Sequence, residues 1–189
     1  MNNYHFTDGN LIILYAIHNN EKNLTSLPNY LIERINLCYN TYQVILKSKP
    51  DASRTMILVF AEDSSSNLVI NELINKGVNK KIIATDSNPK TIYQCFDQVD
   101  ELLKNKLNPP FIYFIGSVWL KDVYDSIILL KKFKNYQMKF EGALDHRPVN
   151  EVEQEKSLYR AKKNKEYYKN TIKNKAVDML LNYIFPEKE

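Results

Sequence analysis

Glycine is scarce in this chain, and its scarcity excludes two common kinds of nucleotide site. The 189 residues include only four glycines, at positions 9, 77, 116 and 142. A GxGxxG dinucleotide loop and a Walker-type phosphate loop both need clustered glycines. A nucleotide that binds this chain must therefore bind without either fingerprint.

Cysteine and long apolar runs are scarce as well. Cys38 and Cys95 have no CxxC spacing, and each falls in an apolar helical pattern, so we expect two small buried side chains. Nothing in this cysteine usage requires an oxidising compartment. The first apolar stretch, residues 11–17, is too short to span a membrane and lacks the flanks of a signal peptide. We therefore expect a cytoplasmic protein with no membrane partner.

Five short apolar runs predict the strands of a sheet. They cover residues 11–17, 56–60, 81–84, 111–115 and 137–140. The first, second and fourth are continuously apolar, as in parallel strands that are covered on both faces. We therefore expect the first two at the centre of the sheet, and the third and fifth nearer its edges.

Helical patterns alternate with these runs. Apolar residues recur at steps of three and four over 31–45, 68–74, 92–103 and 123–130. Ser64, Ser65 and Ser66 precede the second pattern and offer cap oxygens, and Gly77 follows its end. The alternation predicts a three-layer, Rossmann-like α/β fold with a mostly parallel five-stranded sheet.

The C-terminal segment 151–185 differs from the rest of the chain. It contains no helix breaker, and an apolar stripe runs along it at helical spacing: Leu158, Ala161, Tyr168, Ile172, Ala176, Met179 and Tyr183. Eight Lys or Arg residues and one acid lie between positions 156 and 175. We expect a long basic helix packed on a single domain, 1–189, with its lysines in solvent. The net charge of +4 is mild, and we expect no nucleic-acid partner.

Polar residues follow each predicted strand, where a parallel sheet binds its ligands. We expect ten of them to contribute to a small-molecule site: His18, Glu62, Asp63, Ser64, Asp86, Ser87, Thr91, Ser117, His146 and Arg147. The last two follow the fifth strand, and Asp145 beside them can join the carboxylates. The pattern assigns no catalytic residue, metal or cofactor.

Each of these groups has a structural alternative. Glu62 and Asp63 can act as acid and base or hold a hard cation, or they can stabilise the start of the next helix. His18 can be a general base, a metal ligand or a hydrogen-bonded loop residue. Gly116 and Ser117 can open a helix as a cap or as an anion site. Arg147 can grip a phosphate, or pair with Asp145 or Glu141.

The order of elements and several short segments resemble the YdcF-like family. Arg34 falls in the first helix, where the family usually has an arginine, and Gly77-Val78 matches its Gly-Val step. The segment 86–91 resembles the family's Ser-x-Asn-Thr segment, with Ser87 and Thr91 retained, and 111–117 resembles its strand ending in Thr-Ser. The resemblance implies a Rossmann-like fold of poorly understood function.

The departures from that family concern its site. His18 and Ala61-Glu62 stand where the family has glycines, and Tyr93-Gln94 replaces a Glu-Asn pair. Leu120 and Val123 stand where it carries a histidine and an arginine. Three functions stay open: binding of a nucleotide-like or phosphorylated small molecule, a non-catalytic interaction protein on a retired enzyme scaffold, and nucleic-acid association through the basic segment.

Overall fold

The computed structural model describes residues 9–18, 24–48, 54–130 and 133–158. By its contacts the chain divides into two compact units, residues 1–146 and 147–189. The candidate site lies in the first unit. The expectation of one domain over 1–189 stays a prediction.

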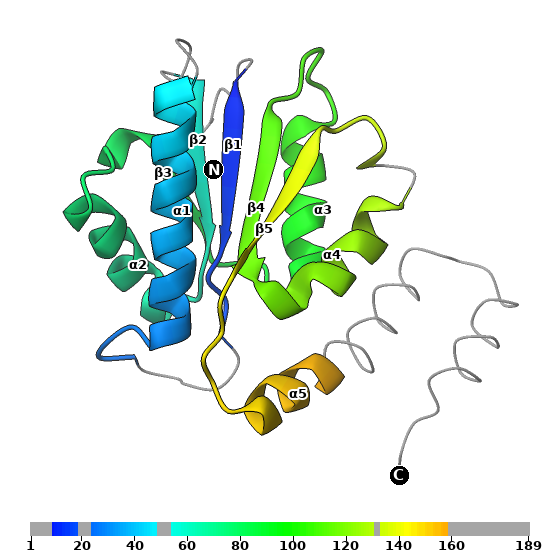
Figure 1. Cartoon of the computed structure of the whole chain (residues 1–189). Coiled ribbons are helices and arrows are strands. Elements are labelled where there is room, and N and C mark those ends of the chain that lie inside the picture. Colours follow the sequence, from blue (N-terminus) through cyan, green and yellow to red (C-terminus); the bar gives the residue numbers. More distant parts are fainter. Residues whose placement is uncertain (1–8, 19–23, 49–53, 131–132, 159–189) are drawn as a thin grey trace, which may run out of the picture. The chain divides into compact units, whose positions relative to one another are not determined.

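The first unit contains one five-stranded parallel sheet (Figure 1). Its strands are β1 (Asn10–Tyr15), β2 (Thr55–Phe60), β3 (Ile83–Asp86), β4 (Phe111–Ser117) and β5 (Met138–Ala143). They are ordered β3-β2-β1-β4-β5, and every neighbouring pair is parallel. The predicted fold class is confirmed, with β1 at the centre, β2 in the interior, and β3 and β5 at the edges.

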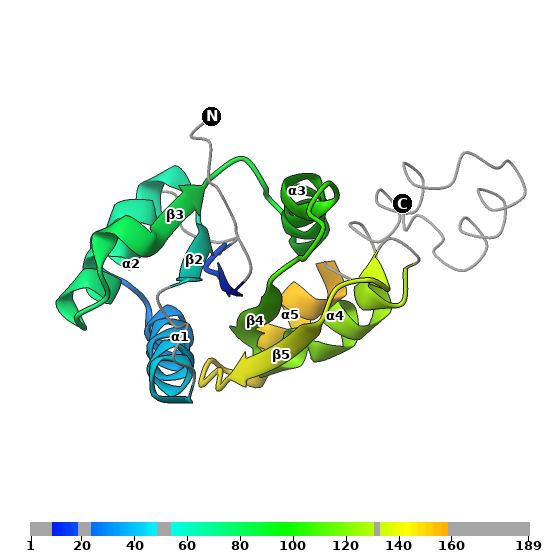
Figure 2. The ribbon, with the colours of Figure 1, turned by 90° about the horizontal axis from the view of Figure 1, so that it is seen from above.

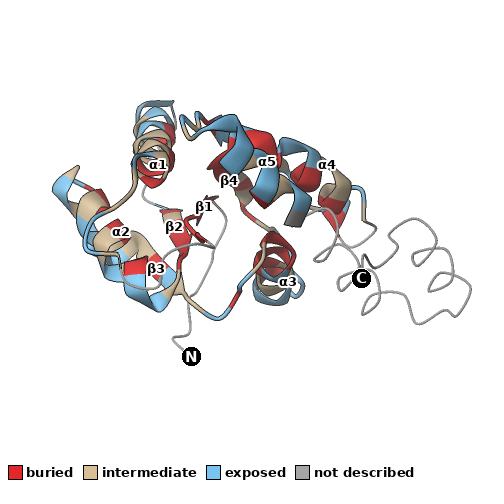
Figure 3. Ribbon diagram, turned by 90° about the horizontal axis from the view of Figure 1, so that it is seen from below, coloured by how far each residue is buried: buried red, intermediate tan, exposed pale blue. Residues whose placement is uncertain are grey.

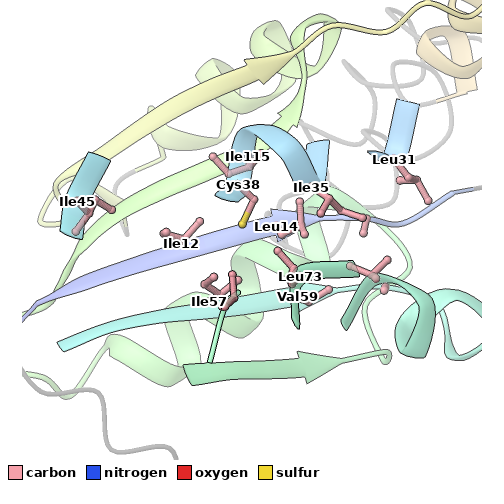
Figure 4. Close-up of a cluster of buried hydrophobic side chains, with 14 residues drawn as sticks. Ile12, Leu14, Leu31, Ile35, Cys38, Ile45, Ile57, Val59, Leu73 and Ile115 are labelled. Carbon is pink, nitrogen blue, oxygen red and sulfur yellow. The ribbon is translucent and has the colours of Figure 1, made fainter. Parts of the chain in front are cut away.

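Four helices cover the two faces of this sheet (Figure 2). They are α1 (Asn29–Ser48), α2 (Asp63–Asn75), α3 (Ile92–Leu103) and α4 (Lys121–Ile128). Apolar residues of α1 and α2 share one core cluster with β1 and β2 (Figure 4). On the other face Phe96 of α3 stacks on Phe114 of β4, 5.0 Å between centroids, and Tyr124 of α4 packs 5.2 Å from Phe140 of β5. The sheet is therefore the middle of three layers.

Burial explains the continuously apolar strands. All six residues of β1 are buried, and five of the six in β2 (Figure 3). A strand with helices on both faces has no solvent side, so its sequence does not alternate. The edge strand β5 alternates more because fewer of its residues are buried.

Several strand boundaries differ from the predicted ones. β1 ends at Tyr15 instead of residue 17, and β4 runs on to Ser117 instead of residue 115. The third and fifth strands differ as well. Residues Lys80–Ile82 form a 3₁₀ turn, η2, in which the Asn79 side chain accepts a hydrogen bond from Lys81 N. The third strand therefore starts at Ile83, and Asp86 is its last residue rather than part of the loop. The fifth strand runs on to Ala143, because its pairing with β4 continues to Ser117.

The start of α2 also differs from the prediction. Glu62 is the N-cap in an extended conformation, and the three serines lie inside the first turn, so their expected role as caps is wrong. Ser65 Oγ instead donates to Glu62 O over 3.2 Å. The predicted end is confirmed: Gly77, at φ +95°, donates its N–H to Ile74 O, as in a glycine-terminated helix.

The second unit is described over 147–158 and contains α5 (Val149–Leu158). Pro148 O accepts from the backbone N–H groups of Glu151 and Val152, which starts the helix. Residues 159–189, which hold most of the predicted basic helix and its apolar stripe, lie outside the described residues. Within the described ranges, no helix is both long and apolar enough to cross a membrane.

Candidate ligand-binding site

The connectivity of the sheet defines where a ligand site is expected. The chain passes from β1 to β2 and β3 on one side, and then crosses back to β4 on the other side of β1. The direction of winding therefore reverses between β1 and β4. In open α/β sheets, ligands bind beyond the carboxyl ends of the strands at such a switch point.

Arg34 of α1 spans this switch point with a fully buried side chain. Its Nε donates to Ser117 Oγ, at the end of β4, over 2.9 Å, and its Nη1 donates to Tyr15 O, at the end of β1, over 3.0 Å. A longer contact of 3.5 Å joins Nη1 to Ile17 O. One guanidinium thus connects the carboxyl ends of the two strands that flank the reversal.

The buried charge of Arg34 has aromatic neighbours, but no carboxylate among the described residues contacts it. Two aromatic rings lie near the guanidinium, with centroids 5.8 Å (Tyr15) and 5.3 Å (Tyr30) from its central carbon. Across the described ranges, no carboxylate contacts it directly, and its buried Nη2 has no hydrogen-bond partner. An unpaired donor on a buried charged group is costly.

Ser117 links Arg34 to a second group of polar side chains. Its hydroxyl accepts from Arg34 and donates to Asp145 Oδ2 over 3.0 Å, and Trp119 Nε1 donates to the same oxygen over 2.9 Å. Ser117 is the last residue of β4 and precedes the 3₁₀ turn η3 (Val118–Leu120) without making a side-chain cap bond. Of the two alternatives for Ser117, an ordinary side-chain cap is therefore not formed, because the hydroxyl is already used in this chain of contacts.

His18 and Glu62 form a second group at the same edge of the sheet. They follow β1 and β2, and His18 Nε2 lies 3.1 Å from Glu62 Oε2. The His18 side chain is 1% exposed and that of Glu62 is 27% exposed. The two atoms are close, but Nε2 makes no aligned hydrogen bond in the described part of the chain. The site thus has a buried imidazole nitrogen beside a carboxylate that reaches solvent.

A third group of polar residues makes its hydrogen bonds within its own loop and the start of α3. It consists of Asp86, Ser87 and Thr91. Asp86 Oδ1 accepts from the backbone N and side-chain Nδ2 of Asn88, over 2.9 and 2.8 Å. Thr91 Oγ1 accepts from Gln94 N and caps α3. Two strands separate β3 from β4, so Asp86 and Ser117 stand about 14 Å apart along the sheet edge. They share that edge without being neighbours.

The remaining predicted site residues are more peripheral. Asp63 and Ser64 lie exposed in the first turn of α2, where the Asp63 charge favours the positive end of the helix. His146 is exposed at the end of the first unit. Arg147 belongs to the second unit and forms a 2.8 Å ion pair with Glu155, while Glu141 pairs with Lys139. A structural ion pair of Arg147 is therefore present, with Glu155 as its partner.

Metal and thiol chemistry find little support in the described residues. Among them, no three His, Cys, Asp or Glu side chains gather as metal ligands. Cys38 and Cys95 are free and buried, as expected. Burial raises the pKa of the Cys38 thiol to about 12, and burial followed by the nearby Asp86 charge raises the pKa of Cys95. Neither thiol forms the thiolate that a nucleophile requires.

Sequence reasoning left Arg34 out of the expected site. A signal for it was present, because Arg34 stands three residues after Leu31 and four before Cys38, on the stripe that buries α1. A charged residue on the apolar face of a helix must find polar partners in the interior. The position of Arg34 on this buried stripe is therefore a signal that the sequence pattern itself contains.

Comparison with known proteins adds no relative. The chain matches no protein-family model, no curated protein and no solved structure. The resemblance to the YdcF-like family therefore stays a prediction. Leu120 and Val123, which stand where that family carries a histidine and an arginine, are buried.

Proposed function

We propose that this protein binds a nucleotide-like or phosphorylated small molecule at the carboxyl ends of β1 and β4, with the anionic group of the ligand on Arg34. The observation that carries this proposal is the buried Arg34 guanidinium with its unpartnered Nη2. We assign no reaction to the site.

The chemistry of the guanidinium supports an oxyanion as the ligand group. Arginine presents its donors in a rigid planar fork that fits phosphate and carboxylate oxygens. Here Ser117 and Tyr15 O hold Nε and Nη1, so the fork is oriented before a ligand arrives. Attraction between opposite charges is also stronger in the interior of a protein than in water. An anion at Nη2 would use a donor that otherwise has no partner.

A second candidate function rests on the same side chain. Arg34 joins the ends of two strands through Ser117 and Tyr15 O, which is what a purely structural bridge would do. That observation favours the non-catalytic interaction protein on a retired scaffold. The nucleic-acid alternative depends on residues 156–175, most of which lie outside the described residues.

A ligand screen with an arginine variant separates the first two candidates. Unfolding midpoints are measured for the wild-type protein, Arg34→Met and Arg54→Met, with inorganic phosphate, nucleotides, S-adenosylmethionine and sugar phosphates. Arg54 is exposed and controls for the loss of one positive charge. A ligand at one hundred times its Kd stabilises by about 2.7 kcal/mol. We expect phosphorylated compounds to raise the midpoint of the wild type and of Arg54→Met, but not of Arg34→Met.

Two results would contradict the proposal. Equal stabilisation of all three proteins would mean that the ligand binds away from Arg34. If no phosphorylated compound stabilises the wild-type protein, Arg34 is a structural bridge, and the result favours the non-catalytic interaction protein.

A further inference from the structure

The pair formed by His18 and Glu62 is not explained by an anion on Arg34. Glu62 is negatively charged when ionised and would repel a phosphate, so it does not belong to an oxyanion subsite. Its carboxylate is partly open to solvent, while His18 Nε2 beside it is buried and makes no aligned hydrogen bond among the described residues. Two polar groups thus lie together at the ligand-binding edge of the sheet.

We propose that His18 and Glu62 form a hydroxyl-binding subsite, so that the ligand carries sugar hydroxyls as well as its anionic group. This inference rests on the proposed function and deepens it to phosphorylated sugars and nucleotides. A hydroxyl both donates and accepts through a single oxygen. It can donate to the Glu62 carboxylate while its oxygen accepts from His18 Nε2.

The two subsites lie beyond the ends of neighbouring strands. His18 follows β1, whose end Arg34 contacts, and Glu62 follows β2, the neighbour of β1. Neighbouring strands lie about 4.8 Å apart, so the ends of β1 and β2 are separated by less than the length of a sugar phosphate. In doubly wound sheets, an acid beyond the second strand is also suitably placed to accept a hydrogen bond from ribose.

The two groups have different tasks in this arrangement. Arg34 supplies a fixed positive charge at the switch point. The carboxylate of Glu62 favours hydrogen-bond donors and disfavours a second anion. A ligand with one phosphate and a polyol part satisfies both subsites, whereas inorganic phosphate satisfies the first alone.

Isothermal titration with two ligands tests the hydroxyl subsite. Ribose 5-phosphate and inorganic phosphate are titrated into the wild-type protein, Glu62→Met and Glu72→Met. Glu72 lies on α2, which Glu62 precedes, is 33% exposed and pairs with Lys76, so it controls for the loss of a partly exposed carboxylate. We expect Glu62→Met to lower the preference for ribose 5-phosphate over phosphate at least tenfold, which is about 1.4 kcal/mol. Glu72→Met should leave this preference unchanged.

The outcomes separate this inference from the proposed function. If the wild type binds both ligands with equal affinity, or if Glu62→Met keeps the preference, the hydroxyl subsite is wrong while the Arg34 site stands. If the wild type binds neither ligand, the inference fails, while the proposed function is decided by the nucleotides and other phosphorylated compounds of the ligand screen. A preference that falls equally in Glu62→Met and Glu72→Met would assign the effect to overall charge and overturn the subsite.

Discussion

Replacing Arg34 with methionine tests whether this side chain is kept for stability or for a ligand. The change removes a fully buried guanidinium and leaves an apolar side chain in its place. Tyr15 O loses its 3.0 Å contact with Arg34, and Ser117 Oγ loses one donor but still donates to Asp145. Leaving a buried acceptor without its partner costs about 1–3 kcal/mol.

An opposite contribution comes from removing the charge itself. The guanidinium is buried without a directly contacting carboxylate in the described ranges, and its Nη2 has no partner. Removing that unpaired charged donor raises the free energy of unfolding by roughly 1–3 kcal/mol or more. Replacing buried ionic groups with apolar ones often leaves the stability unchanged. Because the two contributions are of similar size, we expect the unfolding free energy to change by less than about 2 kcal/mol.

Urea denaturation followed by tryptophan fluorescence measures this difference. The chain has one tryptophan, Trp119, and its Nε1 bonds to the carboxylate that Ser117 also contacts. A loss above about 4 kcal/mol, in the range found when one partner of a buried ion pair is removed, would refute the reasoning. Arg34 would then be a structural bridge whose bonds outweigh the cost of its burial.

Three further expectations concern single residues. Ser117→Ala removes the hydroxyl between Arg34 and Asp145. We expect the free energy of unfolding in urea to fall by about 3 kcal/mol and the Trp119 emission to change. Unchanged values would show that the link through Ser117 is unimportant. Gly77→Ala should lower the free energy of unfolding by about 1–2 kcal/mol in the same assay, because φ at this position is +95°. A Cβ there meets no atom within 4 Å, so the loss comes from backbone strain and not from a clash. An unchanged stability would contradict the observed helix end. Cys38 and Cys95 should react with a thiol reagent only after denaturation, since burial raises both pKa values, and rapid labelling of the native protein would contradict their burial.

Much of the fold could be predicted because burial leaves a direct trace in the sequence. β1 is buried at every residue, so its continuous apolar run predicts a central strand. Competition between two local structures for the same residues is harder to predict from the sequence. At Lys80–Ile82 a 3₁₀ turn capped by Asn79 takes residues that the apolar pattern assigns to the third strand. Cross-strand pairing with β4, which lengthens β5 to Ala143, also leaves no local signal.

The candidate site could be predicted only in outline. The rule that ligands bind at strand carboxyl ends directs attention to His18, Glu62 and Ser117. It does not distinguish loop residues that serve their own loop, such as Asp86, from those that contact another element. It also overlooks Arg34, which lies on a helix and reaches the strand ends from there. Only a three-dimensional arrangement shows that its Nη2 lacks a partner.

Nitrogen NMR of the arginine side chains gives the most direct test of the central claim, that Arg34 receives the anionic group of a ligand. Its buried and hydrogen-bonded guanidinium should give slowly exchanging signals, identified by their loss in Arg34→Met. We expect ribose 5-phosphate to shift these signals in a saturable way and to leave those of the exposed Arg54 unchanged. Two results would contradict the account. In the first, ribose 5-phosphate binds but the Arg34 signals do not shift. In the second, no concentration of ribose 5-phosphate perturbs the protein.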